Sequence, residues 1–430
     1  MLEAMTRYSR LVARSSGAAF FLILFSTSLA WADVAITHVT VIDCTGAAPK
    51  KDQTVIIHDG RIARIGAAAE LDLPRSAQRI DGTGKFLIPG LWDMHGHLTD
   101  AGETALSQLI MNGVTGVRDM GGDLDLIDRW RSEIAAGKRV GPQIVRAGPF
   151  VDGPKPEAKW RLAVNNEAEA RQAVDQLKAR GVDFIKVHNG LSREAFFAVA
   201  DQAKKQGLPL AVHLPRGVSA AEASDAGATS IEHIEILIES SVFRTRATAK
   251  TTDEAIAENS GPEGEALFAR LKKNGTWYDP TLVAFYRGFA LWGGDTKKTK
   301  RRIEVYRHYL ELAGAMHTAG VGILAGSDFS DWALVPGIDL HNELALMVEA
   351  GFTPMEALQT ATLQPAKYLG RLNDLGTIEK GKVADLVLLE QDPLEDISHT
   401  RKINSVVVRG RFLPIARLRD QILNSKAVSQ

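Results

Sequence analysis

The chain has 430 residues, of which 45% are hydrophobic and 24% are charged, and its formal net charge is -1. This length is enough for a large barrel with an accessory domain, and the near-zero charge excludes an electrostatic case for nucleic-acid binding. Cys44 is the single cysteine, which excludes an intrachain disulfide.

The N-terminus has the pattern of a secretory signal peptide over residues 1–32. Three arginines precede the apolar run Ala18–Ala30, which is short for a transmembrane span, and Ala30-Trp31-Ala32 fits a small-x-small cleavage site. We therefore expect the protein to be exported to the periplasm or secreted, without stable membrane insertion after cleavage. An uncleaved membrane anchor is the alternative.

Residues 33–85 are rich in strand-forming residues and predict a small β-domain, in which Asp59-Gly60 indicates a hairpin. His38 and His58 lie within these runs, and we interpret them as ordinary strand residues. Residues 371–430 again contain runs of strand-forming residues, which are followed by a tail. We therefore expect the two chain ends to build one small β-sandwich domain.

Residues 86–370 alternate short apolar runs with helical patterns, which predicts parallel strands joined by helices. Capping boxes at Ser219 and Thr353 indicate two helix starts. Eight strand candidates have the spacing of a TIM (β/α)8 barrel: residues 86–92, 115–119, 143–147, 183–187, 209–213, 229–233, 276–279 and 321–326. Residues 240–275 and 286–302 depart from this regularity and are either lids over the site or plain surface insertions.

Several polar side chains fall at the carboxyl ends of the predicted barrel strands, where barrel enzymes place their chemistry. They are His95, His97, Lys186, His213, His233 and Asp328. His95 and His97 project to one side of an extended chain, and two converging neutral imidazoles suit a divalent metal. Each residue alone has a structural explanation, such as a helix cap for Asp328. Their combination at one barrel edge predicts a metal site.

These motifs resemble those of the amidohydrolase superfamily, in particular its imidazolonepropionase-like and prolidase-like metal-dependent hydrolases. The resemblance covers nearly the whole mature chain, from TVIIHDGRIARIG through PGLWDMHGH, TGVRDMGG, FIKV and GSD to GKVADLVLLEQDPLEDI. It implies two divalent metal ions that Lys186 bridges in an N-carboxylated form. One ion would be bound by His95, His97 and Asp328, and the other by His213 and His233.

The resemblance also implies a mechanism. A lysine beside two cations is driven to its neutral amine, which adds carbon dioxide and becomes an anionic ligand. Two ions about 3.5–4 Å apart share and acidify one water. Asp328 then takes a proton as general base and returns it to the leaving group as general acid. Histidine nitrogen and carboxylate oxygen favour zinc, with manganese or cobalt as substitutes.

Three positions distinguish this chain within the superfamily. The one-metal deaminases carry a glutamate three residues after the strand-five histidine, whereas His213 is followed by Leu214-Pro215-Arg216. Imidazolonepropionase lacks the bridging lysine, so Lys186 favours the two-metal, peptidase-like members. Gly96 stands where the family often has a valine, and we expect it to loosen the strand locally.

We expect the enzyme to cleave an amide bond in a dipeptide or an N-acyl amino acid. His188, Tyr278 and Arg287 lie near predicted strand ends and are candidates to bind the substrate carbonyl or terminal carboxylate, although packing roles explain them equally well. The alternatives are a hydrolase of a lactone, carbamate or phosphotriester, and a non-catalytic barrel that binds a metal or a peptide. A homo-oligomer is left open.

Overall fold

The computed structural model describes residues 33–154, 159–238, 251–291, 297–330 and 334–420. All of these residues belong to one compact unit, residues 31–430. The predicted signal peptide, residues 1–32, lies outside the described residues. Within the described part of the chain, no helix combines the length and apolar character that a membrane crossing requires.

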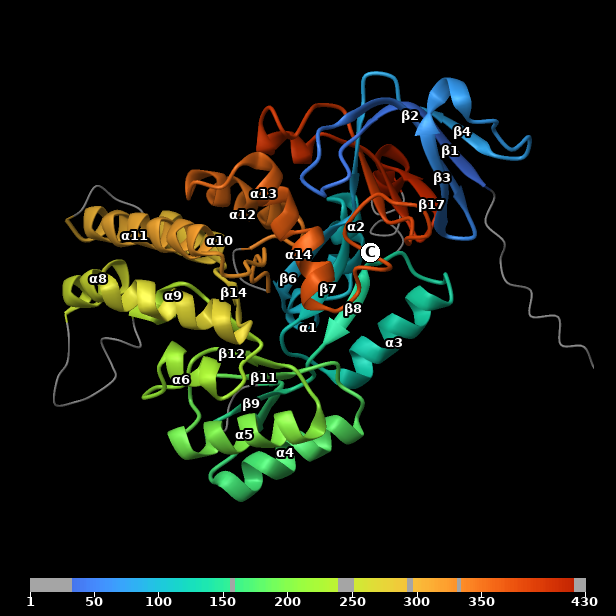
Figure 1. Ribbon diagram of the computed structural model, residues 1–430. Helices are drawn as coiled ribbons and strands as arrows, with labels where there is room; N and C mark the ends of the chain where they lie inside the picture. Colours follow the sequence, from blue (N-terminus) through green and yellow to red (C-terminus); the bar gives the residue numbers. More distant parts are fainter. Residues whose placement is uncertain (1–32, 155–158, 239–250, 292–296, 331–333, 421–430) are drawn as a thin grey trace, which may run out of the picture. The chain divides into compact units, whose positions relative to one another are not determined.

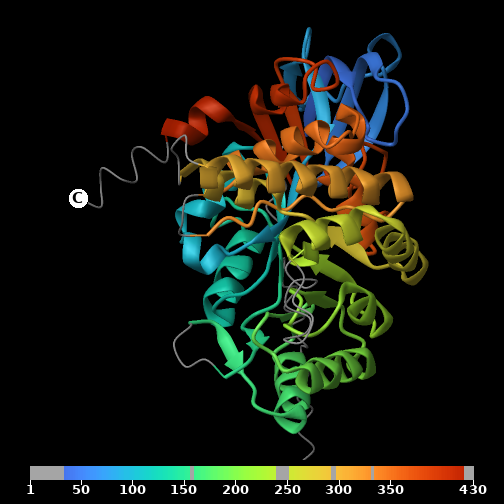
Figure 2. The same ribbon diagram turned by 90° about the vertical axis from the view of Figure 1, so that its left-hand side faces the viewer.

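Both ends of the chain contribute strands to one mixed, eight-stranded sheet, where the first strands, in blue, lie beside the last, in red, in both views (Figures 1 and 2). The order is β17-β16-β15-β5-β1-β2-β3, and β4 pairs with β1. The strands are β1 (Val34–Val41), β2 (Lys50–His58), β3 (Arg61–Ala67), β4 (Gln78–Asp81), β5 (Phe86–Pro89), β15 (Leu386–Leu389), β16 (Ile403–Val408) and β17 (Arg411–Pro414). This is the β-rich domain expected from the two chain ends.

The antiparallel pair of β5 and β15 joins this sheet to the rest of the molecule. Leu388 stands opposite Leu87, and Val387 stands opposite Ile88. Leu87 and Leu388 belong to the core of the sheet itself, whereas Ile88 and Val387 belong to the main core of the protein. Because successive side chains of a strand point to opposite faces, one strand pair contributes to both cores.

The remaining strands are parallel and form the barrel. They are β6 (Leu91–Gly96), β7 (Val114–Asp119), β8 (Gln143–Arg146), β9 (Phe150–Asp152), β10 (Arg161–Ala163), β11 (Ile185–Val187), β12 (Leu210–Val212), β13 (Ser230–Glu232) and β14 (Trp277–Asp279). One sheet has the order β6-β7-β8 and the other β10-β9-β11-β12-β13-β14.

Hydrogen bonds link the two parallel sheets at both of their edges. The main-chain N–H of Asp183, just before β11, donates to the carbonyl of Arg146 at 2.9 Å. On the other side, residues 321–329 bridge the sheets, because Ile323 pairs with Tyr278 and Phe329 pairs with Gly96. Residues 321–329 therefore take the place of the eighth strand of a TIM barrel.

The barrel differs from the sequence prediction in its first and last strands and in two additional short strands that follow β8. The expected strand 86–92 is wrong as one barrel strand, because it is divided between β5 in the mixed sheet and β6 in the barrel. The break falls at Gly90, where a Cβ atom would lie 2.1 Å from Oγ1 of Thr115. Strands β9 and β10 are too short to give a periodic signal and were not predicted. The segment 321–326 contains two glycines and pairs only through single bridges.

Helices surround the barrel, and α4 and α5 pack against each other outside it (Figure 1). The helices are α1 (Leu98–Ala101), α2 (Thr104–Met111), α3 (Leu124–Ala135), α4 (Glu167–Ala179), α5 (Arg193–Gln206), α6 (Ala220–Asp225), α8 (Thr252–Ser260), α9 (Pro262–Asn274), α10 (Leu282–Leu291), α11 (Lys297–Ala319), α12 (Ile338–Glu349), α13 (Pro354–Thr360) and α14 (Leu363–Tyr368). The capping boxes predicted at Ser219 and Thr353 are confirmed at the starts of α6 and α13. The segments 240–275 and 286–302 include α8, α9 and the ends of α10 and α11, and 239–250 and 292–296 lie outside the described residues. Their role as lids stays a prediction.

Candidate metal centre

The carboxyl ends of the barrel strands bring the predicted ligands to one cavity of about 230 Å³. Its described lining residues are His95, His97, Met120, Phe150, Lys186, His188, His213, His233, Glu235, Phe285 and Asp328. The structure thus gathers all the predicted ligands, together with His188, around a single space. The parallel strands explain this convergence, because their carboxyl ends meet at one mouth of the barrel.

Asp328 lies at the centre of the first group of ligands. Its Oδ1 atom is 3.3 Å from Nε2 of His97 and 3.5 Å from Nε2 of His95. One ligand atom from each of these residues lies within 4.8 Å of the others. Such a convergence of two imidazole nitrogens and a carboxylate oxygen is typical of a binding site for a divalent cation.

The second group surrounds His213. Its ring centroid is 4.8 Å from that of His233 and 4.4 Å from that of His188, on which it stacks. Nδ1 of His213 and Nζ of Lys186 are buried and have no hydrogen-bond partner among the residues that the structure describes. Because a buried ammonium without a partner is costly, these two atoms fit a group that the polypeptide itself does not supply.

Burial lowers the pKa of Lys186, His95, His213 and His233 at this site, whereas at His97 burial is outweighed by the hydrogen bond and charge of Asp328 and the pKa is raised. The pKa of Lys186 falls to about 8 and that of His95 to about 4. The pKa of His213 and that of His233 lie well below the ordinary value. Neutral imidazoles are the form that binds a metal, and a neutral lysine amine is the form that reacts with carbon dioxide. The donor set therefore fits divalent metal ions.

Three residues at the site have backbone angles that only glycine adopts freely. The φ angle is 70° at His233, 58° at Asp328 and 46° at Thr281. Hydrogen bonds hold this strained backbone in place. The Asp328 N–H donates to the carbonyl of His95 at 2.7 Å, and the Tyr278 hydroxyl donates to the carbonyl of His233 at 2.9 Å. Nδ1 of His233 lies 2.9 Å from Oγ1 of Thr281, which orients the ring.

Gly96 lies between the two histidines of the first strand. It pairs with Asp119 on one side and with Phe329 on the other, although the register with β7 shifts between Asp93 and Gly96. A Cβ atom on Gly96 would lie 2.3 Å from Cε1 of Phe329. The irregularity expected at Gly96 is thus a register shift, and the missing side chain makes room for the ring of Phe329.

The residues predicted to contact substrate have different positions. His188 lines the cavity. Tyr278 is fully buried and pairs with Ile231, so its side chain points to the opposite face from those of the neighbouring pair, Glu232 and Asp279. Tyr278 is absent from the described lining of the cavity, and its hydroxyl donates to the carbonyl of His233. Its contact with substrate stays a prediction that this position does not support.

Arg287 is also absent from the described lining of the cavity. Its Nη2 atom lies 3.0 Å from Oδ1 of Asp339, which is fully buried. The predicted contact between Arg287 and a substrate carboxylate is therefore not supported by the position of its side chain. A residue just beyond a strand end can turn towards either the barrel or the helices, and Arg287 turns towards α12.

A buried network beneath the ligands was not predicted from the sequence. Oε2 of Glu232 lies 3.1 Å from Nδ1 of His95 and 2.7 Å from Nη2 of Arg118. The same Nη2 atom lies 3.3 Å from Oδ2 of Asp279. Burial raises the pKa of Glu232, but Arg118 outweighs burial and the pKa falls to about 2. Glu232 directly precedes His233 and Arg118 belongs to TGVRDMGG, so strand-end position was an available signal for both.

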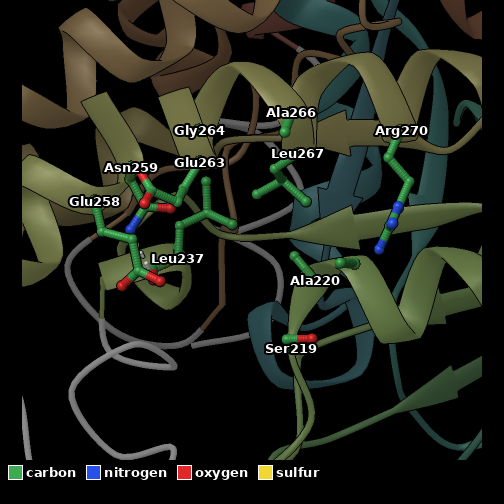
Figure 3. A pocket seen from close by; sticks show the side chains of 11 residues that line it. Ser219, Ala220, Leu237, Glu258, Asn259, Glu263, Gly264, Ala266, Leu267 and Arg270 are labelled. Atoms are coloured by element: carbon green, nitrogen blue, oxygen red, sulfur yellow. Dashed lines mark hydrogen bonds between the residues drawn. The ribbon is translucent and has the colours of Figure 1, made fainter. Parts of the chain in front are cut away.

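A second cavity of about 300 Å³ lies between α6, α8 and α9. Figure 3 shows Glu258 and Asn259 on one side of it, and Ser219 and Arg270 on the other. No histidine occurs among its described lining residues. It therefore offers no donor set comparable with that of the first cavity.

Comparison with known proteins agrees with this geometry. The sequence profile of the amidohydrolase family matches residues 86–413. The chain belongs to the amidohydrolase family. This family membership makes the protein a hydrolase that acts on carbon–nitrogen bonds, and the barrel with its β-rich domain is the fold of its relatives.

Three relatives of this amidohydrolase illustrate the range of the family. An ochratoxinase from Aspergillus niger is 25% identical over 422 residues, covering 81% of this chain and 79% of that protein. An imidazolonepropionase from Idiomarina loihiensis is 25% identical and covers 86% of this chain and 93% of its own. The solved structure of a candidate prolidase from Bifidobacterium longum is 27% identical with a TM-score of 0.72, covering 91% of this chain and 99% of the other.

Proposed function

We propose that this amidohydrolase binds two divalent metal ions and hydrolyses an amide bond in a dipeptide or an N-acyl amino acid. One observation carries the proposal: Nζ of Lys186 is buried in a cavity lined by five histidines and Asp328, without a partner in the described part of the chain. The likeness to a candidate prolidase supports a peptide-like substrate.

The ligand groups suggest how the ions would be divided. His95, His97 and Asp328 would hold one ion, and His213 and His233 the other, with N-carboxylated Lys186 between them. Zinc suits this set of imidazole and carboxylate ligands. Bound ions would supply Lewis acidity towards the substrate carbonyl and would lower the pKa of water.

Asp328 is the proposed general base and acid. Burial raises the pKa of its carboxyl group, but His95 and His97 outweigh burial and the net shift is downward. The carboxylate is therefore ionised near neutral pH and can take the proton of the attacking water. Its side chain is 26% exposed and lines the cavity. A substrate bound there can therefore reach the carboxyl group, which can return the proton to the leaving nitrogen.

His188 is the proposed contact to the substrate carbonyl or carboxylate. Its Nδ1 atom lies 3.1 Å from Oδ1 of Asn189 and 3.6 Å from Oδ2 of Asp152, which orients the ring. Phe150 and Phe285 line the same space with apolar surface. Apolar walls exclude water and strengthen the few polar contacts that a substrate makes.

We also propose that the protein is exported and that residues 1–32 are its signal peptide. The basic and apolar pattern of this segment supports the proposal. Sequencing the N-terminus of protein recovered from its native host tests it, and the expected first residue is Asp33. A mature chain that still begins at Met1 would refute cleavage.

The function is tested by screening dipeptides and N-acyl amino acids with purified protein, with and without a chelator, and by measuring bound metal by mass spectrometry. We expect two ions per chain and hydrolysis that the chelator abolishes. Hydrolysis of these amides that persists after complete metal removal would refute the proposal.

The bridging role of Lys186 has its own test. Lys186→Ala should lose activity and regain part of it with added short carboxylates, which can replace the bridging anion. Lys382→Ala is the matched control, because Lys382 is also buried but donates to the carbonyl of Leu375 at 3.2 Å, outside the cavity. Carboxylate rescue of both variants, or of neither, would contradict the bridge.

A further inference from the structure

We propose that Arg118, acting through Glu232, is a positioning residue that determines which ring nitrogen of His95 carries hydrogen. The other nitrogen is thereby presented to the first metal ion. This inference rests on the metal site proposed above. It also gives a role to Arg118 of the TGVRDMGG motif, which supplies none of the proposed ligands.

The contacts form a continuous path from Arg118 to the ligand group. Nη2 of Arg118 lies 2.7 Å from Oε2 of Glu232, and the same oxygen lies 3.1 Å from Nδ1 of His95. On the opposite edge of the ring, Nε2 of His95 faces Oδ1 of Asp328 at 3.5 Å. Arg118 and Glu232 are completely buried, so water does not compete for these contacts.

The direction of the hydrogen bond follows from the chemistry of the groups. A carboxylate paired with a guanidinium only accepts hydrogen bonds, so the imidazole nitrogen that faces it must donate. A neutral His95 with hydrogen on Nδ1 has its lone pair on Nε2, which points to the proposed ion. The other tautomer would direct an N–H at that position and weaken metal binding.

The geometry of Arg118 fixes the direction of the carboxylate. Its Nε donates to the carbonyl of Met94 at 2.5 Å, and its Nη1 donates to Oγ of Ser230 at 2.9 Å and to the hydroxyl of Tyr368 at 3.0 Å. The planar guanidinium is therefore held through Nε and Nη1, and its remaining nitrogen, Nη2, faces Glu232 at 2.7 Å and Asp279 at 3.3 Å. A lysine has no such rigid fork, so charge alone would not reproduce the arrangement.

Nitrogen-15 NMR of histidine in the metal-free, full-length protein tests this inference directly. In the wild type we expect His95 to carry hydrogen on Nδ1, identified by comparison with His95→Gln. In Arg118→Met and Arg118→Lys we expect a mixture of tautomers and zinc affinity lower by about 10–100-fold, measured by competition with a chromophoric chelator. Tyr368→Phe removes one of the two contacts of Nη1 but leaves those with Ser230 and Met94, which suffice to hold the guanidinium, so it should change neither the tautomer nor the affinity.

The outcomes separate this inference from the proposed function. Hydrogen on Nε2 of His95 in the metal-free wild type would overturn the positioning role even if no Arg118 variant folds. Equal losses of zinc affinity in Arg118→Met and Tyr368→Phe would also overturn it. Glu232→Gln should retain the wild-type tautomer, because one amide oxygen can accept from both neighbours. A wild type that takes up no zinc would refute the metal site and the positioning role together.

Discussion

Replacing Gly96 with valine, the residue common in the family at this position, should damage this particular protein. A Cβ atom would lie 2.3 Å from Cε1 and 2.4 Å from Cζ of Phe329, far short of the 3.4 Å at which ordinary contact begins. Phe329 is fully buried, so its ring has no solvent-exposed space to enter. Overpacking of this kind lowers the free energy of unfolding by about 1–3 kcal/mol.

The substitution should also affect the site, because Gly96 separates His95 from His97 and Phe329 follows Asp328. A displacement of these side chains by about 1 Å costs roughly 100-fold in activity when it disturbs a reacting geometry. We expect Gly96→Val to bind zinc more weakly and to lose hydrolytic activity. Urea unfolding, chelator competition and the rate on the amide identified in the screen would measure the three effects.

A double-mutant cycle tests the assigned cause. Phe329→Ala alone should cost about 3–5 kcal/mol through the cavity it leaves. In the double variant the valine fills part of that cavity, so the combined loss should fall short of the sum by about 0.5–3 kcal/mol. Gly66→Val is the control, since a Cβ there meets Leu71 at an ordinary 3.5 Å. Wild-type stability of Gly96→Val, or strict additivity with Phe329→Ala, would refute the reasoning.

Three further predictions follow from positions near the site. Tyr278→Phe removes the hydroxyl bound to His233 and should lower stability by about 0.5–1.5 kcal/mol, whereas a rise in KM without loss of stability would indicate a substrate contact. Arg287→Ala should lower the thermal midpoint of unfolding, because it removes the cationic partner of the buried Asp339 side chain. The ratio of the KM values for carboxylate-terminated and amidated substrates should not change. Burial raises the pKa of Glu343 from 4.5 to about 8, so the free energy of unfolding of the wild type should fall as the pH rises through this range. Glu343→Gln should make the free energy of unfolding depend less on pH. Equal slopes for the two proteins would contradict this prediction.

The predicted ligands could be found from the sequence because two simple rules apply to them. Polar residues that interrupt apolar strands are conspicuous, and parallel strands place their carboxyl ends together. These rules located His95, Lys186, His213 and Asp328 without knowledge of strand pairing. They do not state on which face a mid-strand residue lies, so they could not place Tyr278 outside the described lining of the cavity.

The sequence did not reveal which side chains and strands far apart in the chain contact one another. Arg118 and Glu232 are separated by 114 positions, and although both lie near strand ends, nothing in the sequence indicates that they pair with each other. The division between β5 and β6 was likewise hidden, because both strands are apolar. The close approach of Thr115 explains why the junction between these two strands is a glycine, Gly90.

The pairing of β5 with β15 has a consequence for how the protein is made. Residues 86–89 pair with residues 386–389, so this ladder cannot form until the ribosome has synthesised the chain through residue 389. Until then the apolar side chains of Leu87 and Ile88 lack their partners on β15, and exposed apolar surface of this kind favours aggregation of incomplete chains. Closing a loop of this length is entropically unfavourable, and we expect docking of the C-terminal strands to be a late, slow step of folding.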